Sequence, residues 1–385
     1  MRTSVPVDVD AVKEAVEAIS GLIESRVPEI DRGRRLPDDV VSALRQTGIN
    51  RLFMPTALGG LEAPVVDIMQ VIERIAAIDG STAWCAAIGA GSNIFAGYMP
   101  EAGAREVFAD PDQGSATMLA PIGTLVDAGG ERRLTGRWPF TSNCLHSAWI
   151  GLGATSQQAD GAAPRPRVAF VRAADLTIED TWSVVGLRGT GSHHVAARDV
   201  LVEDDRCCGM GDRPWPDGPL WRLPLYTALL PTLASVPLGI ARGALDEIRR
   251  QATEGRTARR GQLADDPISM AQFATADARL RAAGAGLREA VEEAWRQAER
   301  GDRVERPLQA RILLASMHAS DTSTEAASAA HQLGGGAATY VGSRLLRALG
   351  DVQASRQHLL FSPTHLGQLA KALAGLEVSY PPYFT

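Results

Sequence analysis

The hydrophobic periodicity of the chain changes twice along its length, and these changes constrain the fold more than any single motif. In roughly the first hundred residues, apolar side chains recur every three to four positions, which is the spacing of amphipathic helices. An early set of them is Val12, Val16, Ile19 and Ile23. Between about Gly114 and Arg206, short apolar runs are separated by Gly, Pro and Asp clusters, a pattern typical of β-strands. After Leu229 the helical spacing returns.

The long segments after Leu229 are rich in alanine and amphipathic, so they predict the helices of an antiparallel bundle. They are residues 232–252, 269–300, 311–333 and 362–376. The pattern as a whole predicts an α+β protein in three parts. These are an N-terminal helical domain (residues 1–112), a central antiparallel β domain (113–215) and a C-terminal four-helix bundle (216–385).

The composition narrows the function and the compartment. With 385 residues and 45% hydrophobic side chains, the chain can bury a large core. The formal net charge of -6 leaves no basic surface for nucleic acid or an anionic membrane, so we expect a small-molecule ligand. The N-terminus lacks a signal-peptide pattern and no run of about 18 apolar residues occurs, which predicts a cytoplasmic protein that does not enter the membrane. No metal site is expected, because His193, His194, Cys207 and Cys208 lack metal-ligand spacing.

The segment WPFTSN, residues 138–143, combines groups that can hold a flat ring with a polar edge. Trp138 and Phe140 can stack on a ring face. The hydroxyls of Thr141 and Ser142 can form hydrogen bonds to its edge. A plain strand that ends in a polar turn is the alternative interpretation.

Two glycine-rich segments also indicate close approach of the backbone to another group. LRGTGS, residues 187–192, offers glycines together with the polar side chains of Arg188, Thr190 and Ser192, although a plain hairpin would have the same pattern. Gly334, Gly335 and Gly336 interrupt a helical stretch, where each costs about 1 kcal/mol relative to alanine. A flexible linker between helices is the alternative there.

Three segments together resemble the acyl-CoA dehydrogenase superfamily, in the same order and at similar separations. They are RWPFTSNCLHSAW (137–149), DTWSVVGLRGTGSHHV (180–195) and HQLGGGAATYVGSRLLRALGD (331–351). WPFTSN together with GLRGTGS is most similar to the oxygenase branch, the two-component (group D) flavin-dependent monooxygenases. The resemblance implies FAD or FMN used in the reduced form, with FADH2 favoured, and a separate NAD(P)H-dependent flavin reductase that supplies it.

The resemblance also implies which residues contact the flavin. Ser142 would lie near N5 and Phe140 against a ring face, while the backbone near Met118 would touch the pyrimidine end and Arg259 a phosphate. The full implied set is Met118, Leu119, Ala120, Phe140, Thr141, Ser142, Arg188, Thr190, Arg259, Gly334, Gly335 and Gly336. In the family the glycine turn holds the adenosine diphosphate part of a flavin bound to a neighbouring subunit, which implies a homotetramer.

The departures from the family distinguish its branches. The two places from which acyl-CoA dehydrogenases draw their catalytic glutamate hold Leu359 and Leu229, so the base of the dehydrogenase reaction is missing. His358 falls where several oxygenases carry an active-site histidine. If its segment is helical, His358 shares a face with Asp351, seven residues earlier, and a pKa near neutrality would let it transfer protons. A second histidine of some oxygenases is replaced by Gly89.

The resemblance implies the oxygenase component of a reduced-flavin-dependent monooxygenase, with His358 and Ser142 as catalytic residues. It would insert one oxygen atom from O2 into a small organic substrate through a C4a-hydroperoxyflavin in a dry pocket, in aromatic or specialised-metabolite metabolism. Two alternatives stay open at this point. One is a flavin oxidase or acyl-CoA dehydrogenase-like oxidoreductase, and the other is a non-catalytic flavin-binding scaffold.

Overall fold

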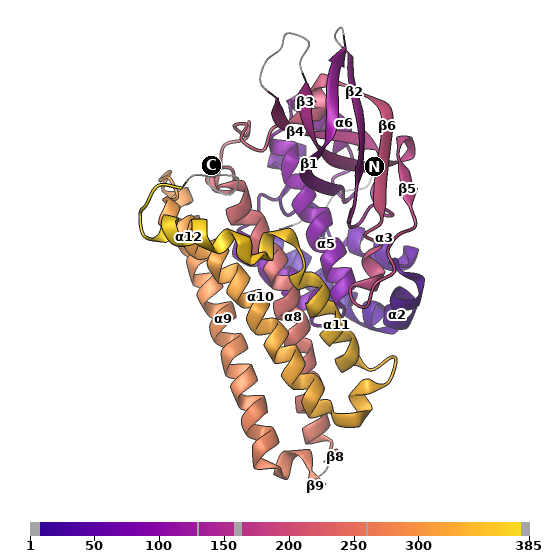
Figure 1. Ribbon diagram of the computed structural model, residues 1–385, viewed down its shortest axis with the longest axis vertical. Helices are drawn as coiled ribbons and strands as arrows, with labels where there is room; N and C mark the ends of the chain where they lie inside the picture. Colours follow the sequence, from indigo (N-terminus) through magenta and orange to yellow (C-terminus); the bar gives the residue numbers. More distant parts are fainter. Residues whose placement is uncertain (1–7, 129–130, 158–163, 259–260, 379–385) are drawn as a thin grey trace.

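The N-terminal part of the protein is helical, as its periodicity predicts. The computed structural model describes residues 8–128, 131–157, 164–258 and 261–378 (Figure 1). The helices here are α1 (Val9–Ala18), α2 (Ser20–Gly33), α3 (Asp38–Gln46), α4 (Val65–Ala76), α5 (Gly80–Ser92) and α6 (Glu101–Val107). Every residue of α5 except Ile88 is buried, because small side chains let neighbouring elements pack closely around it.

The central part forms one seven-stranded sheet. Its strands are β1 (Ala116–Ala128), β2 (Glu131–Trp138), β3 (Trp149–Gln157), β4 (Arg165–Arg172), β5 (Thr177–Glu179), β6 (His194–Val202) and β7 (Cys207–Cys208). They lie in the order β5-β6-β2-β1-β3-β4-β7. The expectation of a purely antiparallel sheet is wrong at one pair, since β1 and β3 are parallel. The chain turns back after β2 and joins the other edge of β1, so β3 runs in the direction of β1.

The C-terminal part is a bundle of long helices, which occupies the lower half of Figure 1. Its helices are α7 (Pro219–Arg222), α8 (Leu225–Thr253), α9 (Pro267–Glu299), α10 (Arg306–Gly334), α11 (Arg344–Arg356) and α12 (Leu366–Leu373). The fourth bundle helix was expected over residues 362–376, but α11 packs beside α8 and α10, whereas α12 is short. A proline turn at Pro363 precedes α12 and Gly375, with φ 71°, follows it, so the helix has little room to extend.

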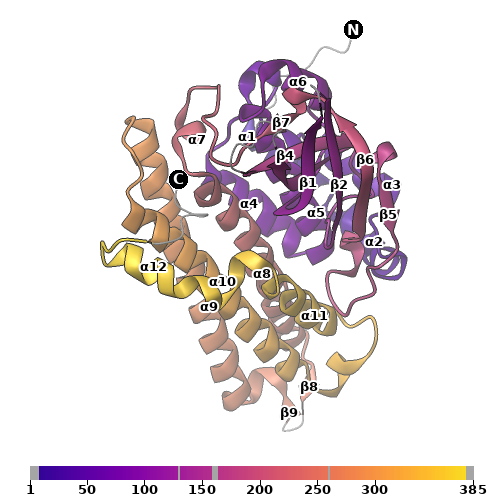
Figure 2. The same cartoon turned by 45° about the horizontal axis from the view of Figure 1, so that its top comes forward.

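Helix α8 lies at the centre of the molecule (Figure 2). It has 29 residues and is long and apolar enough to cross a membrane by length and composition, but 89% of its most apolar window is buried inside the fold. It packs against α4, α5, α9, α10 and α11. We therefore interpret α8 as a core helix. A short hairpin of β8 (Thr257–Ala258) and β9 (Gly261–Gln262) follows it at the lower tip of the bundle.

Helix α5 connects the three parts of the fold. It contacts α4 in the N-terminal part, β1 in the sheet, and α8 and α11 in the bundle. It also contacts the 3-10 helix η5 (Arg188–Thr190), which belongs to the glycine-rich loop before β6. Side chains on α5 can therefore join groups that are far apart in the sequence.

Candidate active site

The polar segment after β2 forms a strained turn. Phe140 and Asn143 have left-handed backbone conformations, with φ of 60° and 65°, which cost non-glycine residues about 1 to 3 kcal/mol each. Two main-chain hydrogen bonds hold the turn: Thr141 N donates to His193 O (3.0 Å) and Asn143 N donates to Thr190 O (3.4 Å). The segments WPFTSN and LRGTGS, which the sequence analysis selected separately, are thus brought together.

Ser142 lies in a buried chain of hydrogen-bonding side chains. The indole Nε1 of Trp84 donates to Ser142 Oγ (3.0 Å). Ser142 Oγ also lies 2.7 Å from Ser192 Oγ, which in turn lies 2.7 Å from Thr190 Oγ1. Thr190 Oγ1 donates to the carbonyl oxygen of Leu187 (2.8 Å). All of these side chains are buried, so the chain is shielded from bulk water.

Trp84 also contacts His358, which is far away in the sequence. The two rings meet edge to face, with centroids 5.6 Å apart and an interplanar angle of 64°. The ring of Phe361 also meets the imidazole edge to face, with ring centroids 6.2 Å apart. One indole on α5 therefore joins the two residues that the sequence analysis predicted to be catalytic.

His358 lies outside helix α11, contrary to expectation. The helix ends at Arg356, and His358 has extended backbone angles (φ -62°, ψ 136°) before the 3-10 helix η9 (Leu359–Phe361). Its side chain caps η9, because Nδ1 accepts a hydrogen bond from Leu360 N (3.4 Å). His358 and Asp351 therefore do not share a helical face, and the prediction that they do is wrong.

The imidazole of His358 is neutral at physiological pH. Desolvation beside Trp84 and Phe361 lowers the pKa of His358 to about 4, below the near-neutral value expected from the sequence, although the residue stays partly exposed to solvent. Since Nδ1 accepts a hydrogen bond, the single ring hydrogen belongs on Nε2. His358 can thus donate a hydrogen bond from Nε2 without carrying a charge.

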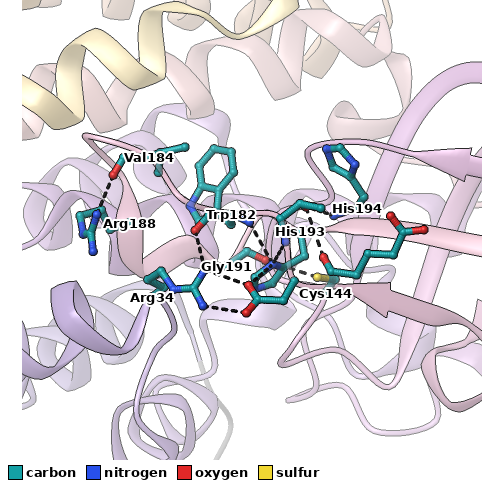
Figure 3. Close-up of polar contacts among 11 residues, drawn as sticks. Arg34, Cys144, Trp182, Val184, Arg188, Gly191, His193 and His194 are labelled. Carbon is teal, nitrogen blue, oxygen red and sulfur yellow. Dashed lines mark hydrogen bonds and ion pairs between the residues drawn. The ribbon is translucent and has the colours of Figure 1, made fainter.

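The loop before β6 is clamped to the N-terminal helices (Figure 3). Arg34, at the end of α2, forms two 2.8 Å bonds to the carboxylate of Asp180 and one of 3.1 Å to Trp182 O. This guanidinium lowers the pKa of Asp180. His193 Nδ1 accepts from Trp182 N (3.2 Å), and burial lowers the pKa of this histidine. The clamp fixes the position of the loop that carries Thr190 and Ser192.

Arg188 also serves this loop. Its Nη1 donates to Val184 O (2.7 Å; Figure 3). Its Nε lies 3.2 Å from a carboxylate oxygen of Asp31 on α2. The guanidinium therefore binds protein groups on both sides. Its role as a flavin contact stays a prediction.

Asp351 anchors the same loop from the bundle side. Its Oδ1 accepts from the N–H of Leu187 (2.6 Å), a residue with left-handed φ of 51°. The loop and α11 touch through two glycines, since a side chain at Gly186 would lie 1.9 Å from Gly350 O. Burial, and to a lesser extent the nearby Asp79, raises the pKa of Asp351 to about 7.

The predicted contact of residues 118–120 lies on a bulge in β1. The register between β1 and β3 shifts between Met118 and Gly123. A side chain at Gly153 would lie 2.4 Å from the carbonyl oxygen of Leu119, so the bulge packs directly on β3. Just before β1, Ser115 O accepts from Asn143 Nδ2 (3.3 Å), which ties β1 to the WPFTSN turn.

Gly89 stands where the family pattern has a second histidine, and the structure leaves no space for a side chain there. A Cβ at Gly89 would lie 2.9 Å from Asn50 Oδ1 and 3.3 Å from Asn143 Nδ2. It would also contact Gly114 at 3.6 Å. The glycine therefore permits α5 to approach the WPFTSN turn closely.

The three-glycine segment lies at the lower end of the bundle in Figure 1, far from the sheet. Gly334 ends α10 against Leu345, whose side chain would lie 2.4 Å from an added Cβ. Gly335 has a positive φ of 59°, and Gly336 borders open space. Arg259 lies outside the described residues. The structure therefore does not bring the glycine turn to Ser142 within one chain.

Comparison with known proteins identifies the family. The description "Acyl-CoA dehydrogenase, N-terminal domain" matches residues 9–107, and "Acyl-CoA dehydrogenase, C-terminal domain" matches residues 231–363. The chain is 34% identical to indole-3-acetate monooxygenase of Pseudomonas putida over 87% of this chain and 86% of that protein. It is 30% identical to the flavin-dependent monooxygenase oxygenase subunit HsaA of Rhodococcus jostii (strain RHA1), over 91% and 94% of the two chains.

The chain belongs to the flavin-dependent monooxygenase branch of the acyl-CoA dehydrogenase superfamily. The resemblance noted in the sequence is thereby confirmed. The solved structure of XiaF from Streptomyces sp. in complex with FADH2 and glycerol has the same fold, with a TM-score of 0.90 at 28% identity over 97% of each chain. The protein is a flavin-dependent monooxygenase, an oxidoreductase that uses reduced flavin and O2 to oxygenate a small organic substrate.

The side chains of this monooxygenase fit a flavin beside the WPFTSN turn. Phe140 is 64% exposed, although Trp138, Thr141, Ser142 and Asn143 of the same motif are buried. Its ring meets Trp182 (6.3 Å) and His194 (5.9 Å) edge to face, and His194 Nδ1 is a buried atom with no hydrogen-bond partner among the described residues. Exposed aromatic surface next to a buried hydroxyl, Ser142, suits a planar ring with polar edge atoms.

Sequence reasoning missed Trp84 as a residue of this site. A signal was present, since Trp84 is the single aromatic side chain within GSTAWCAAIGAGS, the sequence of α5, which otherwise holds mainly small residues. An indole N–H in a buried position requires an acceptor, which here is Ser142. The identity of that acceptor depends on how α5 packs against the sheet, which no local pattern shows.

Proposed function

We propose that this monooxygenase is the oxygenase component of a two-component system that hydroxylates an aromatic compound. A separate NAD(P)H-dependent reductase would supply reduced flavin, with FADH2 favoured, and both would work in the cytoplasm. The names of similar proteins support this proposal, because one acts on indole-3-acetate and another is called an oxygenase subunit. A dehydrogenase reaction is disfavoured, because the two positions from which acyl-CoA dehydrogenases draw their catalytic glutamate, 229 and 359, hold leucines.

The observation that carries the residue roles is the position of Trp84 between Ser142 and His358. Ser142 is the residue proposed to contact flavin N5, and His358 is the residue proposed to face the substrate. The indole bonds to one (3.0 Å) and packs against the other (5.6 Å between ring centroids). A site for an aromatic substrate next to the flavin would lie along this line.

When bound, reduced flavin supplies the electrons and the reactive carbon with which O2 combines. Ser142 fixes the N5 edge of the ring through its buried hydroxyl. His358 would donate a hydrogen bond from Nε2 to an oxygen atom of the substrate or of the reacting O2, and its low pKa keeps the imidazole neutral. Trp84 and Phe361 cover part of the imidazole, which limits the access of water to it, although His358 stays partly exposed in the single chain.

The substitution His358→Ala tests these roles. The variant is expected to fold and to bind reduced flavin, but product formed per reduced flavin should fall and hydrogen peroxide should rise. Loss of one positioned hydrogen-bond donor typically costs roughly 10² to 10³ in rate. His318→Ala is the matched control, because His318 is an exposed histidine on α10. Substrate candidates are simple phenols and indoles, with product and peroxide measured together in single-turnover reactions.

An unchanged ratio of product to peroxide in His358→Ala would contradict the role of His358 and reduce it to a packing residue. If the wild-type protein bleaches a bound oxidised flavin with an acyl-CoA, the hydroxylase assignment itself fails.

We also propose that the protein assembles as a homotetramer through its bundle. A cavity of about 550 Å³ opens between α9 and α10, and it is lined by apolar side chains such as Ile268 and Ala326 together with polar ones such as Arg279 and Glu325. Tyr340 and Val341, directly after the glycine turn, are exposed. A neighbouring subunit's flavin and side chains would cover these groups, which supports the expectation that Gly334 to Gly336 complete a site on another copy.

A further inference from the structure

The hydroxyl chain behind Ser142 has a fixed direction. Its atoms follow one another at short distances: Leu187 O, Thr190 Oγ1 (2.8 Å), Ser192 Oγ (2.7 Å) and Ser142 Oγ (2.7 Å). A hydroxyl has one hydrogen to donate and two lone pairs with which to accept. Since the first atom is a carbonyl oxygen, which can only accept, the hydrogens of the chain can be assigned in order.

Thr190 must give its hydrogen to Leu187 O, because two oxygen atoms 2.8 Å apart without a hydrogen between them would repel. Thr190 then has only lone pairs for Ser192, so Ser192 donates to Thr190. By the same argument Ser142 donates its hydrogen to Ser192. Trp84 Nε1 occupies one lone pair of Ser142 Oγ, and the second lone pair is left for a ligand.

The carbonyl that starts this chain is held firmly in place. The N–H of Leu187 donates to Asp351 Oδ1 (2.6 Å), and its carbonyl oxygen also accepts from Trp182 Nε1 (3.0 Å). Thr190 and Ser192 are almost completely buried. A reversed chain would leave Leu187 O with its two N–H donors, Trp182 Nε1 and Thr190 N (3.2 Å). It would, however, set the lone pairs of Thr190 Oγ1 against this carbonyl oxygen at 2.8 Å, which is repulsive.

We propose that Thr190 and Ser192 make the site selective for reduced flavin by holding Ser142 as a hydrogen-bond acceptor. The inference rests on the proposed contact between Ser142 and flavin N5. Reduced flavin carries a hydrogen on N5 and can donate it to Ser142, whereas oxidised flavin has a lone pair at N5 and finds no donor there. The protein then discriminates the redox state of a diffusing flavin through two hydroxyls that act by way of Ser142. For Thr190 this role takes the place of the direct flavin contact that the resemblance implies.

The test compares the affinities for dithionite-reduced FAD and oxidised FAD by anaerobic isothermal titration calorimetry. The wild-type protein should prefer reduced FAD by roughly tenfold or more, since one hydrogen bond is gained in one state only. Thr190→Val removes the hydroxyl and frees Ser192 to donate toward Ser142, so the preference should fall by roughly tenfold. Thr190→Ser retains a hydroxyl and should restore it.

Two further variants separate this inference from the function on which it depends. Ser142→Ala should weaken reduced FAD by roughly tenfold and leave oxidised FAD nearly unchanged. Thr324→Val, which removes a hydroxyl bonded to Ser320 O on α10, should change neither affinity. If Ser142→Ala leaves both the affinity for reduced FAD and the affinity for oxidised FAD unchanged, the contact between Ser142 and N5 is refuted, and the proposed selectivity is refuted with it. If Ser142→Ala weakens reduced FAD but Thr190→Val keeps the full preference, the contact stands and the directed chain is refuted.

Discussion

Replacing Asp351 by asparagine should remove the contribution that this carboxyl makes to the pH dependence of the free energy of unfolding. The carboxyl is buried and its pKa is raised to about 7, against about 3.9 in an unfolded chain. The folded protein therefore binds more protons than the unfolded chain between these values. The stability associated with protonated Asp351 is complete below about pH 4 and is lost as the pH rises through about 7, at a total of about 4 kcal/mol.

The asparagine variant cannot show this loss, because its side chain does not ionise. Its amide oxygen can still accept the hydrogen bond from Leu187 N. We expect the free energy of unfolding of Asp351→Asn, minus that of the wild type, to increase by about 2 to 3 kcal/mol between pH 5 and pH 8. Taking the difference removes the opposite slope of His358, whose pKa is lowered to about 4 in both proteins.

The measurement is urea unfolding followed by tryptophan fluorescence at several pH values. Asp217→Asn is the control, since its side chain is 88% exposed and water solvates the carboxylate in both states. A difference between Asp351→Asn and wild type that stays flat with pH would refute the reasoning. It would mean that Asp351 remains ionised in the fold and that the Leu187 N–H compensates for its burial.

Two other substitutions test the site and the assembly. Trp84→Phe removes the 3.0 Å hydrogen bond to Ser142, so it should lower the free energy of unfolding by about 1 to 3 kcal/mol and raise peroxide release. An unchanged ratio of product to peroxide would show that Trp84 only packs. Val341→Asp places a charge on a residue that is 96% exposed in the single chain, and sedimentation should show smaller species than a tetramer if a neighbour covers it. A variant that stays tetrameric would exclude this turn from the interface.

The types of element could be predicted from the sequence because each has its own period. The short apolar runs between Gly114 and Arg206 do form strands, among them β2, β3, β4 and β6. The pairing of β1 with β3 could not be predicted, since the alternation of side chains tells which face is buried and not which strand is adjacent. The domain boundaries at residues 112 and 215 stay a prediction.

The candidate site could be predicted in pieces but not as a whole. Ser142 and Thr190 could be selected because WPFTSN and LRGTGS combine hydroxyls with aromatic or glycine residues and resemble segments of the family. Their connection through Ser192 depends on the left-handed turn at Phe140, and φ values above zero at bulky residues are not visible in a sequence. The pKa of His358 required knowledge of its burial, which only the packing of α5 against η9 supplies.

The spacing of Asp351 and His358 has a different meaning from the one that the sequence suggested. They do not lie on one helical face; they stand at the two ends of one continuous set of contacts. Asp351 binds the N–H of Leu187, and the chain of hydroxyls leads from the Leu187 carbonyl to Ser142. Trp84 then joins Ser142 to His358. Because α11 and η9 are adjacent in the chain, a single short segment supports the loop behind the proposed N5 contact and also presents His358, the proposed hydrogen-bond donor.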